Sequence, residues 1–425
     1  MAFETALSGL NAASSDLDIV GNNIANSNTS GFKSARGEFA DIYAISNLGV
    51  AGNSIGQGVA LKNVAQEFAQ GQFEFTGNTL DMAINGDGFF GLTDENGANT
   101  YTRSGAFSVD TNGNIVNSSG NKLQGFRVNS DGNVASTTPE DMVVTIGAAT
   151  PNPTTEVTIV ANVDSSESAK TAAFDSSDTN TYNHSTSTNV YDNQGTAHQL
   201  TTYFRKESSN TWSCYLEIDG SSVNSGGQDH ITVEFAANGT PYRWSNDGGT
   251  TWNTKTATSD PFESIDFDAF AVTTGADPIT ISDMDLSGMT QYGSDFSVTT
   301  LSQNGYSTGI FTDMDIDSSG NIFARFSNGQ AQILGRIAVI NFPSPSNLRQ
   351  VGETSWSETF ASGTAIASSP GTSGVGNIES GALEQSNVNL TEQLVKMITA
   401  QRNFQANAQM ISTSDQITQT IINIR

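Results

Sequence analysis

The residue run with the most recognisable chemistry is Gly86–Gly91, with the sequence Gly-Asp-Gly-Phe-Phe-Gly. Its glycine spacing matches the dinucleotide-binding fingerprint, in which a helix must begin at the glycines and point its N-terminus at a pyrophosphate. Here Leu92 and Thr93 lead directly into another turn, Asp94-Glu95-Asn96-Gly97. The sequence therefore favours a β-turn that uses the positive φ angles open to glycine over a nucleotide site.

Two aspartate-rich segments have the opening spacing of a calcium-binding loop. Both read Asp-x-Asp-x-Ser-Gly, one from Asp283 and the other from Asp315. The twelfth position of such a loop supplies a bidentate carboxylate, but these segments place Ser294 and Phe326 there. Asp, Ser and Gly are also the residues of tight turns, so hairpin turns are the favoured interpretation.

Few groups are available for general acid–base or nucleophilic chemistry. The sequence has three histidines, none at metal-ligand or catalytic-triad spacing: His184, His198 and His230. Its single cysteine, Cys214, excludes an intramolecular disulfide and lies among alternating large apolar residues, which favours a packed strand position over a reactive thiol. Trp244 and Trp252 could line a glycan groove, although packing in a hairpin is favoured. We expect no enzymatic activity, no cofactor and no metal.

The charge balance is unusual. Only 14% of the 425 residues are charged, and 44 acidic residues against 17 basic ones give a net charge of −27. A chain with this negative charge repels phosphate backbones and anionic lipid surfaces. Nucleic-acid binding is therefore not expected. The segment Met1–Leu10 lacks the basic and long apolar regions of a cleaved signal peptide, and no run approaches the roughly 20 apolar residues of a bilayer span. We expect no membrane insertion, and if the chain leaves the cell, it must do so by a route that needs no cleaved signal peptide.

The two ends of the chain are predicted to be helical. Near the N-terminus, apolar residues recur at helical spacing, at Leu7, Leu10, Leu17 and Ile24. Near the C-terminus, Asn389 and Glu392 have the spacing of a capping box, and no Gly or Pro follows them. One apolar stripe is predicted on this second helix, formed by Leu390, Leu394, Met397, Phe404, Ile411, Ile417, Ile421 and Ile424. The two helices are expected to pair as a coiled coil.

Between these ends the chain alternates short apolar-polar runs with Asn-Gly, Asp-Gly and Ser-Gly turns, which is typical of antiparallel sheet. The predicted fold is multi-domain, with an α-helical terminal domain and nested all-β domains. Residues 1–70 and 380–425 are expected to form the helical terminal domain with an extended linker, and residues 71–147 and 289–379 a middle β domain. Residues 148–288 form an inserted outer β domain, bounded by prolines on one side and by Leu286-Ser287-Gly288 on the other.

Six motifs give the chain a resemblance to a known family. They are Ser8–Ala13, Val20–Lys33, Phe75–Phe90, Tyr101–Phe107, Gly381–Leu390 and Ala400–Asn407. These segments resemble the signatures of the flagellar rod and hook axial protein family, and they extend over nearly the whole chain apart from the insert. The insert and the segment Ala40–Tyr43 favour the longer hook-type members over the short distal rod subunits. A secreted carbohydrate-binding or adhesive β protein is the alternative from another class.

The resemblance implies a structural subunit of the flagellum. Such subunits leave the cell unfolded through the flagellar type III export apparatus and assemble outside it, beneath a cap scaffold, into a curved tube that transmits motor torque. The implied partners are further copies of the chain, the distal rod protein, the hook cap and the hook–filament junction protein. The residues expected to carry subunit assembly are Leu7, Leu10, Leu17, Asn22, Asn23, Ile24, Asn26, Gly31, Phe32, Leu390, Leu394, Met397, Phe404, Ile411, Ile417 and Ile421.

Overall fold

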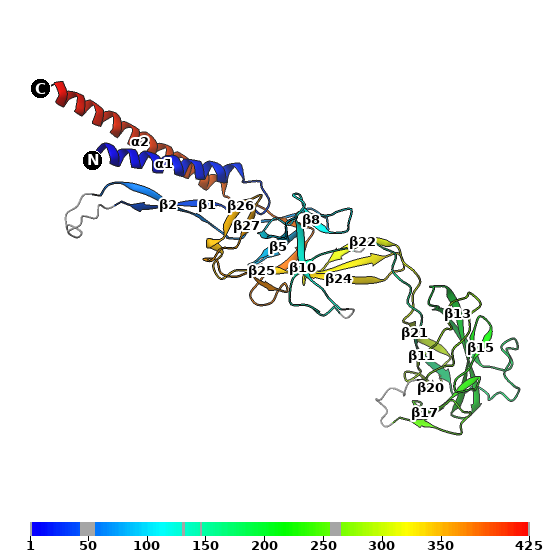
Figure 1. The fold of residues 1–425 in the computed structure, drawn as a ribbon. Coiled ribbons are helices and arrows are strands. Elements are labelled where there is room, and N and C mark those ends of the chain that lie inside the picture. The colour runs from blue at the N-terminus through cyan, green and yellow to red at the C-terminus, as the bar shows by residue number, and fades with distance from the viewer. Residues whose placement is uncertain (1, 43–55, 130–131, 145–146, 256–264, 424–425) are drawn as a thin grey trace. The chain divides into compact units, whose positions relative to one another are not determined.

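The computed structural model describes residues 2–42, 56–129, 132–144, 147–255 and 265–423. The chain divides into two compact units (Figure 1). Unit 1 consists of Met1–Ile146, Asp313–Arg325 and Ala331–Arg425, and unit 2 of Gly147–Thr312 and Phe326–Gln330. Unit 2 therefore interrupts the sequence of unit 1. Tyr43 and Ile424, which the sequence analysis singled out, lie outside the described residues.

Two long helices belong to unit 1 and pack side by side, α1 (Ala2–Ala25) and α2 (Leu390–Asn423) (Figure 1). Asn389 caps α2, because its Oδ1 accepts hydrogen bonds from the backbone N–H groups of Thr391 at 3.0 Å and Glu392 at 3.3 Å. The Glu392 carboxylate pairs with Lys396 at 2.8 Å, one turn along the helix. The predicted terminal helix pair with a mostly β middle is confirmed.

The β part of unit 1 contains one large antiparallel sheet and three two-stranded sheets. The large sheet has the central order β22-β23-β24-β9-β5-β6-β27-β26. Its central strands are β22 (Phe311–Ile316), β23 (Asn321–Phe326), β24 (Ala331–Ile337), β9 (Lys122–Phe126), β5 (Phe89–Thr93), β6 (Asn99–Thr102), β27 (Ser355–Ser357) and β26 (Arg349–Gly352). Its side strands are β7 (Phe107–Val109), β8 (Ile115–Asn117), β10 (Glu140–Asp141), β25 (Val339–Asn341) and β28 (Ile366–Ser368). A short 3₁₀ turn, η1 (Pro345–Asn347), follows β25.

The two-stranded sheets connect segments that are far apart in the sequence. One is an extended pair near α1, β1 (Ala35–Asp41) with β2 (Val59–Gln66). The other two join the first part of unit 1 to the last: β4 (Met82–Asn85) with β29 (Asn377–Ser380), and β3 (Phe73–Phe75) with β30 (Ala382–Glu384). The segment that precedes α2 is thus held in register against the segment that follows β2.

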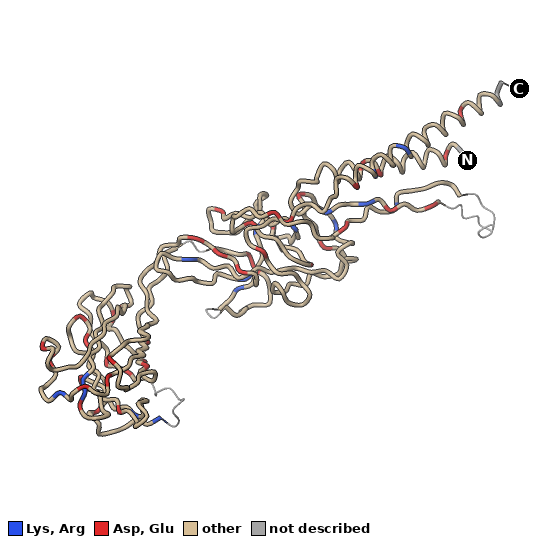
Figure 2. The backbone as a smooth tube through the Cα atoms, turned by 180° about the vertical axis from the view of Figure 1, so that it is seen from behind, with Lys and Arg blue, Asp and Glu red and all other residues tan. Residues whose placement is uncertain are grey.

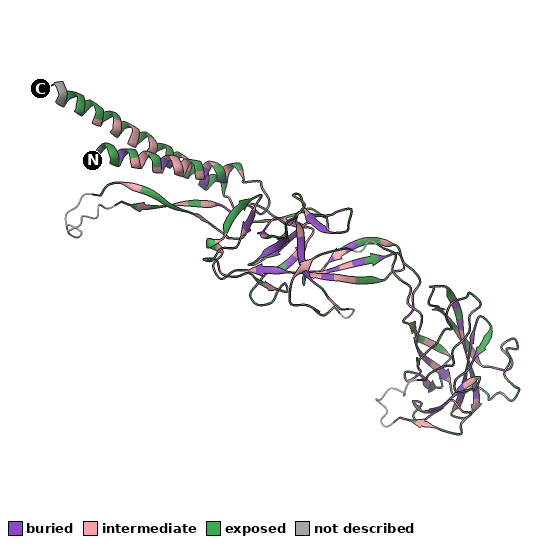
Figure 3. Ribbon diagram, viewed as in Figure 1, coloured by how far each residue is buried: buried purple, intermediate pink, exposed green. Residues whose placement is uncertain are grey.

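Edge-to-face aromatic contacts fill the core of unit 1. The Phe68 ring lies 5.4 Å from both Phe89 and Trp356, and the Tyr101 ring lies 4.8 Å from Phe342. Such pairs are favourable because the positive edge of one ring meets the negative face of another. Phe68 comes from the segment that follows β2, so this cluster also anchors the connection to the helices. Figure 3 shows the buried residues concentrated in the sheets.

Unit 2 is built from two sheets around one apolar core. The larger sheet has the order β12-β13-β14-β16-β17-β18, with β15 beside β14. Its strands are β12 (His184–Tyr191), β13 (Ala197–Ser208), β14 (Thr211–Ile218), β15 (Ser221–Val223), β16 (His230–Phe235), β17 (Pro241–Ser245) and β18 (Asn253–Thr254). The smaller sheet surrounds β11 (Glu156–Asp164) with β19 (Asp283–Asp285), β20 (Thr290–Tyr292) and β21 (Ser297–Gln303).

The predicted end of the insert at residue 288 differs from the structure. β11 pairs in parallel with β20 and antiparallel with β21, so the chain through the end of β21 belongs to unit 2, whose first segment extends to Thr312, at the start of β22. The turn at Leu286–Gly288 connects β19 to β20 within one sheet rather than one domain to the next. A turn signal marks where the chain bends, but strand pairing decides which sheet the following residues join.

The turns that resembled ligand sites are structural. Gly86 and Gly88 have φ angles of 125° and 123° and precede strand β5 rather than a helix. In the second aspartate segment, Asp317 Oδ1 accepts the backbone N–H groups of Ser319 and Asn321, both at 2.9 Å, and Gly320 has a φ of 75°. This closes the hairpin between β22 and β23.

Trp244 and Trp252, for which hairpin packing was favoured over a glycan groove, both pack within unit 2. Trp244 belongs to the buried core, and the guanidinium of Arg243 lies 4.3 Å from the centre of the Trp252 ring. Arg243 also donates two hydrogen bonds to Glu234, at 2.9 and 2.7 Å. The cation therefore covers the Trp252 ring, as expected for a hairpin stabilised by cation–π packing.

Cys214 provides a test of the core of unit 2. The side chain is fully buried in β14, and burial raises the pKa of its thiol to about 12. Since the thiolate is the reactive form, native protein at pH 8 should resist alkylation by iodoacetamide and should react stoichiometrically only in guanidinium chloride. Intact-mass measurement distinguishes these outcomes, and rapid labelling of the native chain would contradict the packed strand position.

Candidate assembly site: the helix pair and a buried ion-pair junction

The two helices meet along a seven-residue repeat. Ala6, Ala13 and Val20 are buried on α1 at seven-residue intervals, together with Asn23, and Gln393 and Ala400 are buried on α2 seven residues apart. Small residues bring the backbones close together: a Cβ added to Gly9 would lie only 2.7 Å from Asn407 Oδ1. Because Gly9 meets Asn407 while Asn23 meets Gln393, the helices run antiparallel. The seven-residue interval between the buried positions is the spacing of a coiled-coil seam.

The stripe predicted on α2 is divided between two surfaces, which corrects the single stripe of the sequence analysis. Met397, Phe404 and Ile411 are half-buried and follow the seam with α1. Leu390, Leu394 and Ile417 are about half exposed, at 46%, 50% and 55%. The apolar surface of α2 is wider than a single stripe. Residues spaced 3, 4 and 7 positions apart do not all fall on the same face of a helix with 3.6 residues per turn.

The other helix residues that were predicted to carry assembly also differ in their exposure. Leu10, Leu17 and Ile24 on α1 are half-buried, whereas Leu7 is 42% exposed. Ile421 lies in α2, but its side chain is outside the described part of the chain. The seam residues that the site prediction omitted are the small and polar ones, above all Gln393 and Ala400; their seven-residue spacing was the signal that could have identified them.

Asn23 ties the end of α1 to two other segments. Its Nδ2 donates to the Ala35 carbonyl at 2.7 Å and to Gln393 Oε1 at 3.3 Å, and its Oδ1 accepts the Ala35 N–H at 2.9 Å. The side chain is almost fully buried, and each of these bonds replaces a bond that water would otherwise make. Asn23 thus fixes the start of β1 against both helices.

The end of α1 and the turn after it contain the other residues that were predicted to carry assembly. Asn26 Nδ2 donates to the Asn22 carbonyl at 2.9 Å, while the Asn22 side chain is exposed. Gly31 has a φ of 72°, and a Cβ there would lie 2.3 Å from the Ser104 nitrogen. No other residue fits this position without moving the backbone. Phe32, which follows, is buried.

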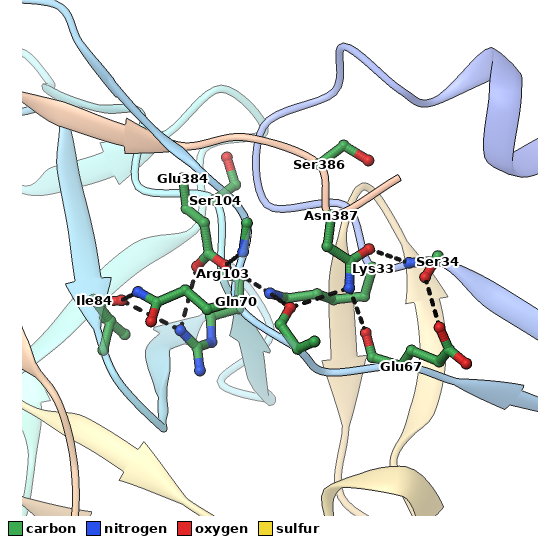
Figure 4. Close-up of polar contacts among 12 residues, drawn as sticks. Lys33, Ser34, Glu67, Gln70, Ile84, Arg103, Ser104, Glu384, Ser386 and Asn387 are labelled. Atoms are coloured by element: carbon green, nitrogen blue, oxygen red, sulfur yellow. Dashed lines mark hydrogen bonds and ion pairs between the residues drawn. The ribbon is translucent and has the colours of Figure 1, made fainter. Parts of the chain in front are cut away.

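Next to this turn lies a buried cluster of three charges (Figure 4). Lys33 Nζ lies 2.6 Å from Glu384 Oε1, and both side chains are fully buried. Arg103 Nη1 lies 3.2 Å from the other oxygen, Glu384 Oε2, and is 3% exposed. Glu384 Oε1 also accepts the N–H of Gly71 at 2.8 Å, and Lys33 donates to the Ala69 carbonyl at 2.8 Å. One carboxylate therefore holds together four distant stretches of the chain.

Asn387 completes this arrangement on the side nearer α2 (Figure 4). Its Oδ1 accepts the backbone N–H of Ser34 at 2.8 Å, and its Nδ2 donates to the carbonyls of Glu67 and Ala69 at 2.7 and 3.0 Å. We refer to Lys33, Arg103, Glu384 and Asn387 as the junction. It links the chain leaving α1, the chain leaving β2 and the chain entering α2.

The electrostatics of the junction depend on Glu384. Burial lowers the pKa of the Lys33 ammonium and of the Arg103 guanidinium, and the Glu384 carboxylate acts in the opposite direction on both. Asp87 adds a smaller opposing effect at Arg103. Because a buried charge without a partner is costly, two cations that share one carboxylate make that carboxylate indispensable.

The site prediction missed all four junction residues, although the motifs behind the family resemblance contained them. Lys33 ends the first long motif, Arg103 lies in Tyr101–Phe107, and Glu384 and Asn387 lie in Gly381–Leu390. A charged residue within an otherwise uncharged motif was the available signal. Figure 2 shows how sparse such charges are along the backbone.

Within the described residues there is no cluster of three or more His, Cys, Asp or Glu side chains that could hold a metal ion. Neither helix, over the part of the chain that the structure describes, is apolar enough along its length to cross a membrane.

Comparison with known protein families agrees with this architecture. The family model for the flagellar basal body rod protein matches residues 3–33, and the model for the C-terminal part of the FlgEFG rod proteins matches residues 379–424. The FlgE/F/G D1 domain model matches residues 83–162, and the FlaE D2 domain model matches residues 160–306. The matches place the fold and its two terminal segments among the flagellar axial proteins.

Full-length relatives narrow the class further. The chain is 39% identical over 430 residues to the flagellar hook protein FlgE of Escherichia coli K12, with 100% of both chains covered. It is 30% identical to the FlgE of Treponema pallidum, covering 99% of this chain and 98% of that protein. The crystal structure of Helicobacter pylori FlgE2 has a similar fold, with a TM-score of 0.50 at 15% identity, covering 73% of this chain and all of the other. The chain belongs to the FlgE family of flagellar hook proteins, which are structural proteins, and the alternatives of a rod subunit and a carbohydrate-binding protein are not supported.

Replacing Glu384 tests the junction. Glu384→Gln keeps the shape of the side chain but leaves Lys33 and Arg103 as buried cations without a counter-charge, which we expect to destabilise unit 1 by about 3–5 kcal/mol. Hydrogen exchange of the Gly31 and Gly71 amides, compared with amides in β14, measures this loss locally. Glu392→Gln, which removes an exposed carboxylate on α2, is the matched control and should leave these amides unchanged. Equal exchange in both variants would show that the junction is not held by charge.

Proposed function

We propose that this chain is the repeating subunit of the flagellar hook, a curved and flexible tube that transmits motor torque to the filament, and that its two terminal helices form the polymerisation core. The observation that carries the proposal is the second apolar surface of α2. Leu394, Val395 and Ile398 are exposed to 50%, 60% and 50% and lie within little more than one helical turn of one another. Apolar patches of this kind usually mark interaction surfaces, and in a homopolymer further copies of the chain cover them.

The assignment of individual residues follows from this division of surfaces. The seam between α1 and α2, with Met397, Phe404 and Ile411, stabilises the subunit itself. The outward residues Leu7, Leu390, Leu394 and Ile417 contact neighbouring copies. Asn22, Asn23, Asn26, Gly31 and Phe32 hold the turn that fixes α1 to the rest of unit 1, so they act on assembly by positioning the helix.

The junction supports the mechanical part of the proposal. A tube that transmits torque needs a subunit whose helices do not swing freely on a flexible linker. Lys33, Glu384 and Arg103 replace such a linker with short, buried, charge-assisted bonds between backbone segments. Bending of the tube is then expected at contacts between copies rather than inside this part of the subunit.

The remaining assignments come from the family. We propose that the chain leaves the cell through the flagellar type III apparatus without a cleaved signal peptide, assembles beneath the hook cap, and contacts the distal rod protein and the hook–filament junction protein at the two ends of the tube. We propose no catalytic role, no cofactor and no nucleic-acid partner. We also propose that unit 1 functions as two parts, a helical core formed by residues 1–70 and 380–425 and a middle β domain.

The exposed apolar surface gives a direct test. We expect Leu394→Asp to abolish tube formation while leaving the monomer folded, because the side chain is half exposed in the monomer but buried in the polymer. Each copy would lose about 1.5–3 kcal/mol of apolar burial and gain a desolvated carboxylate. Electron microscopy of the purified protein measures assembly, and circular dichroism checks the monomer. Asn246→Asp in unit 2 is the control; normal tubes from Leu394→Asp would refute the role of this helix face.

The net charge gives a second test. With −27 on every copy, assembly in vitro should become easier as ammonium sulfate rises, since the salt screens repulsion and strengthens apolar burial. Sedimentation of polymer across a salt series measures this. A steady loss of polymer with increasing salt would contradict the proposed balance between repulsion and apolar contact.

A further inference from the structure

Unit 1 contains a polar pocket that takes no part in the helix seam. Its volume is about 450 Å³, and it lies between the turn after α1, the end of β6, the turn between β8 and β9, and the turn between β26 and β27. The lining is almost entirely Ser, Thr and Asn, for example Thr29, Ser104 and Asn117. Glu353 contributes the single carboxylate. A pocket of this size and polarity has room for one side chain with several hydrogen-bond donors.

The carboxylate is held at this pocket by a strained turn. Glu353 and Thr354 have φ angles of 53° and 52°, at the tip of the hairpin between β26 and β27. Positive φ at both central positions is normal for Asn-Gly, but it is unfavourable for a β-branched residue such as Thr354. Strain of this kind persists only where the surroundings impose it, and it concentrates at functional positions.

Two hydrogen bonds impose the strained conformation from the walls of the pocket. Thr102 Oγ1 donates to the Thr354 carbonyl at 2.8 Å, and the Ser119 hydroxyl donates to Glu353 Oε2. Within the described part of the chain, the other carboxylate oxygen, Glu353 Oε1, accepts no hydrogen bond from the protein. The pocket therefore presents one exposed anionic acceptor among hydroxyl oxygens that can also accept.

These acceptors fit a cationic side chain. Arginine carries five N–H donors and lysine three, and neither accepts, so either side chain matches a wall of hydroxyl and carboxylate oxygens. In a homopolymer the nearest source of such a group is a second copy of the chain. Since each copy carries 44 acidic and only 17 basic residues, contacts that place a basic residue of one copy against an acidic residue of the next offset part of the repulsion.

We propose that the Glu353 pocket receives an arginine or lysine side chain of a second copy when subunits assemble. This proposal rests on the proposed polymerisation but concerns a surface other than the helices. The pocket adjoins the turn that includes Thr29 and Ser30, which directly precede Gly31 of the assembly site. A contact at the pocket would thus bear on the segment through which the helices are attached to the sheet.

The experiment compares Glu353→Gln with Glu95→Gln in the full-length chain. Both substitutions remove one exposed carboxylate from a turn of unit 1, but Glu95 is not among the residues that line the pocket. We expect Glu353→Gln to raise the critical concentration for polymerisation about tenfold, as loss of a charged hydrogen bond should, and Glu95→Gln to leave it near wild type. Monomer melting temperatures, which should be equal in the two variants, show that the difference is not misfolding.

A photo-crosslink identifies the occupant. A benzophenone amino acid introduced at Ser118, on the pocket wall, is irradiated in polymer made from a mixture of ¹⁴N and ¹⁵N copies, and the linked peptides are mapped by mass spectrometry. Mixed-isotope peptides that contain Lys or Arg from the second copy support the proposal. Links only within one copy, or to segments without a basic residue, overturn it.

The outcomes separate this inference from the proposed function. If wild type and Glu95→Gln polymerise and Glu353→Gln does so at the same concentration, the pocket proposal fails and the hook assignment stands. If wild-type protein forms no polymer under any salting-out condition, both fail.

Discussion

One buried carboxylate holds the architecture of unit 1 together. Glu384 accepts from Lys33, Arg103 and the Gly71 amide, and these groups come from three separate stretches of the chain. Without this partner the two cations would remain buried at a high cost in free energy, so the contact favours the arrangement in which these segments meet at Glu384. Asn387 and Asn23 connect further distant segments through hydrogen bonds between uncharged groups. The helices are thereby attached to the sheet by specific polar contacts as well as by apolar burial.

The helix pair combines a seam of small residues with apolar side chains that remain exposed. Small residues on the seam, such as Ala13 and Ala400, are buried and bring the backbones close. Larger side chains, including Leu394 and Ile417, remain about half exposed. Since apolar burial scales with area, the proposed polymer would gain stability by covering them with other copies.

Unit 2 follows a different plan. Its two sheets share one core with large buried side chains such as Trp212 and Phe204, and its alternating strand β11 buries every second residue. This core is made of residues from unit 2 alone, so the insertion carries its own source of stability. An insertion with its own core can vary without disturbing Glu384 or the helix seam. The family models likewise treat residues 160–306 as a domain of their own.

The sequence by itself determined the local features: the Asn389 cap, the long helix without Gly or Pro, the aspartate turns, the buried strand position of Cys214, and the family motifs. These depend on neighbours a few residues away, where side-chain periodicity and turn chemistry act directly. Only the tertiary structure decided which apolar side chains of α2 face α1, because Met397 and Leu394 are equally apolar in sequence. The same holds for the pairing of β11 with β21 and for the contact between Lys33 and Glu384, which are 351 positions apart. Such contacts depend on strand register and on the closure of long loops, and no local pattern records either.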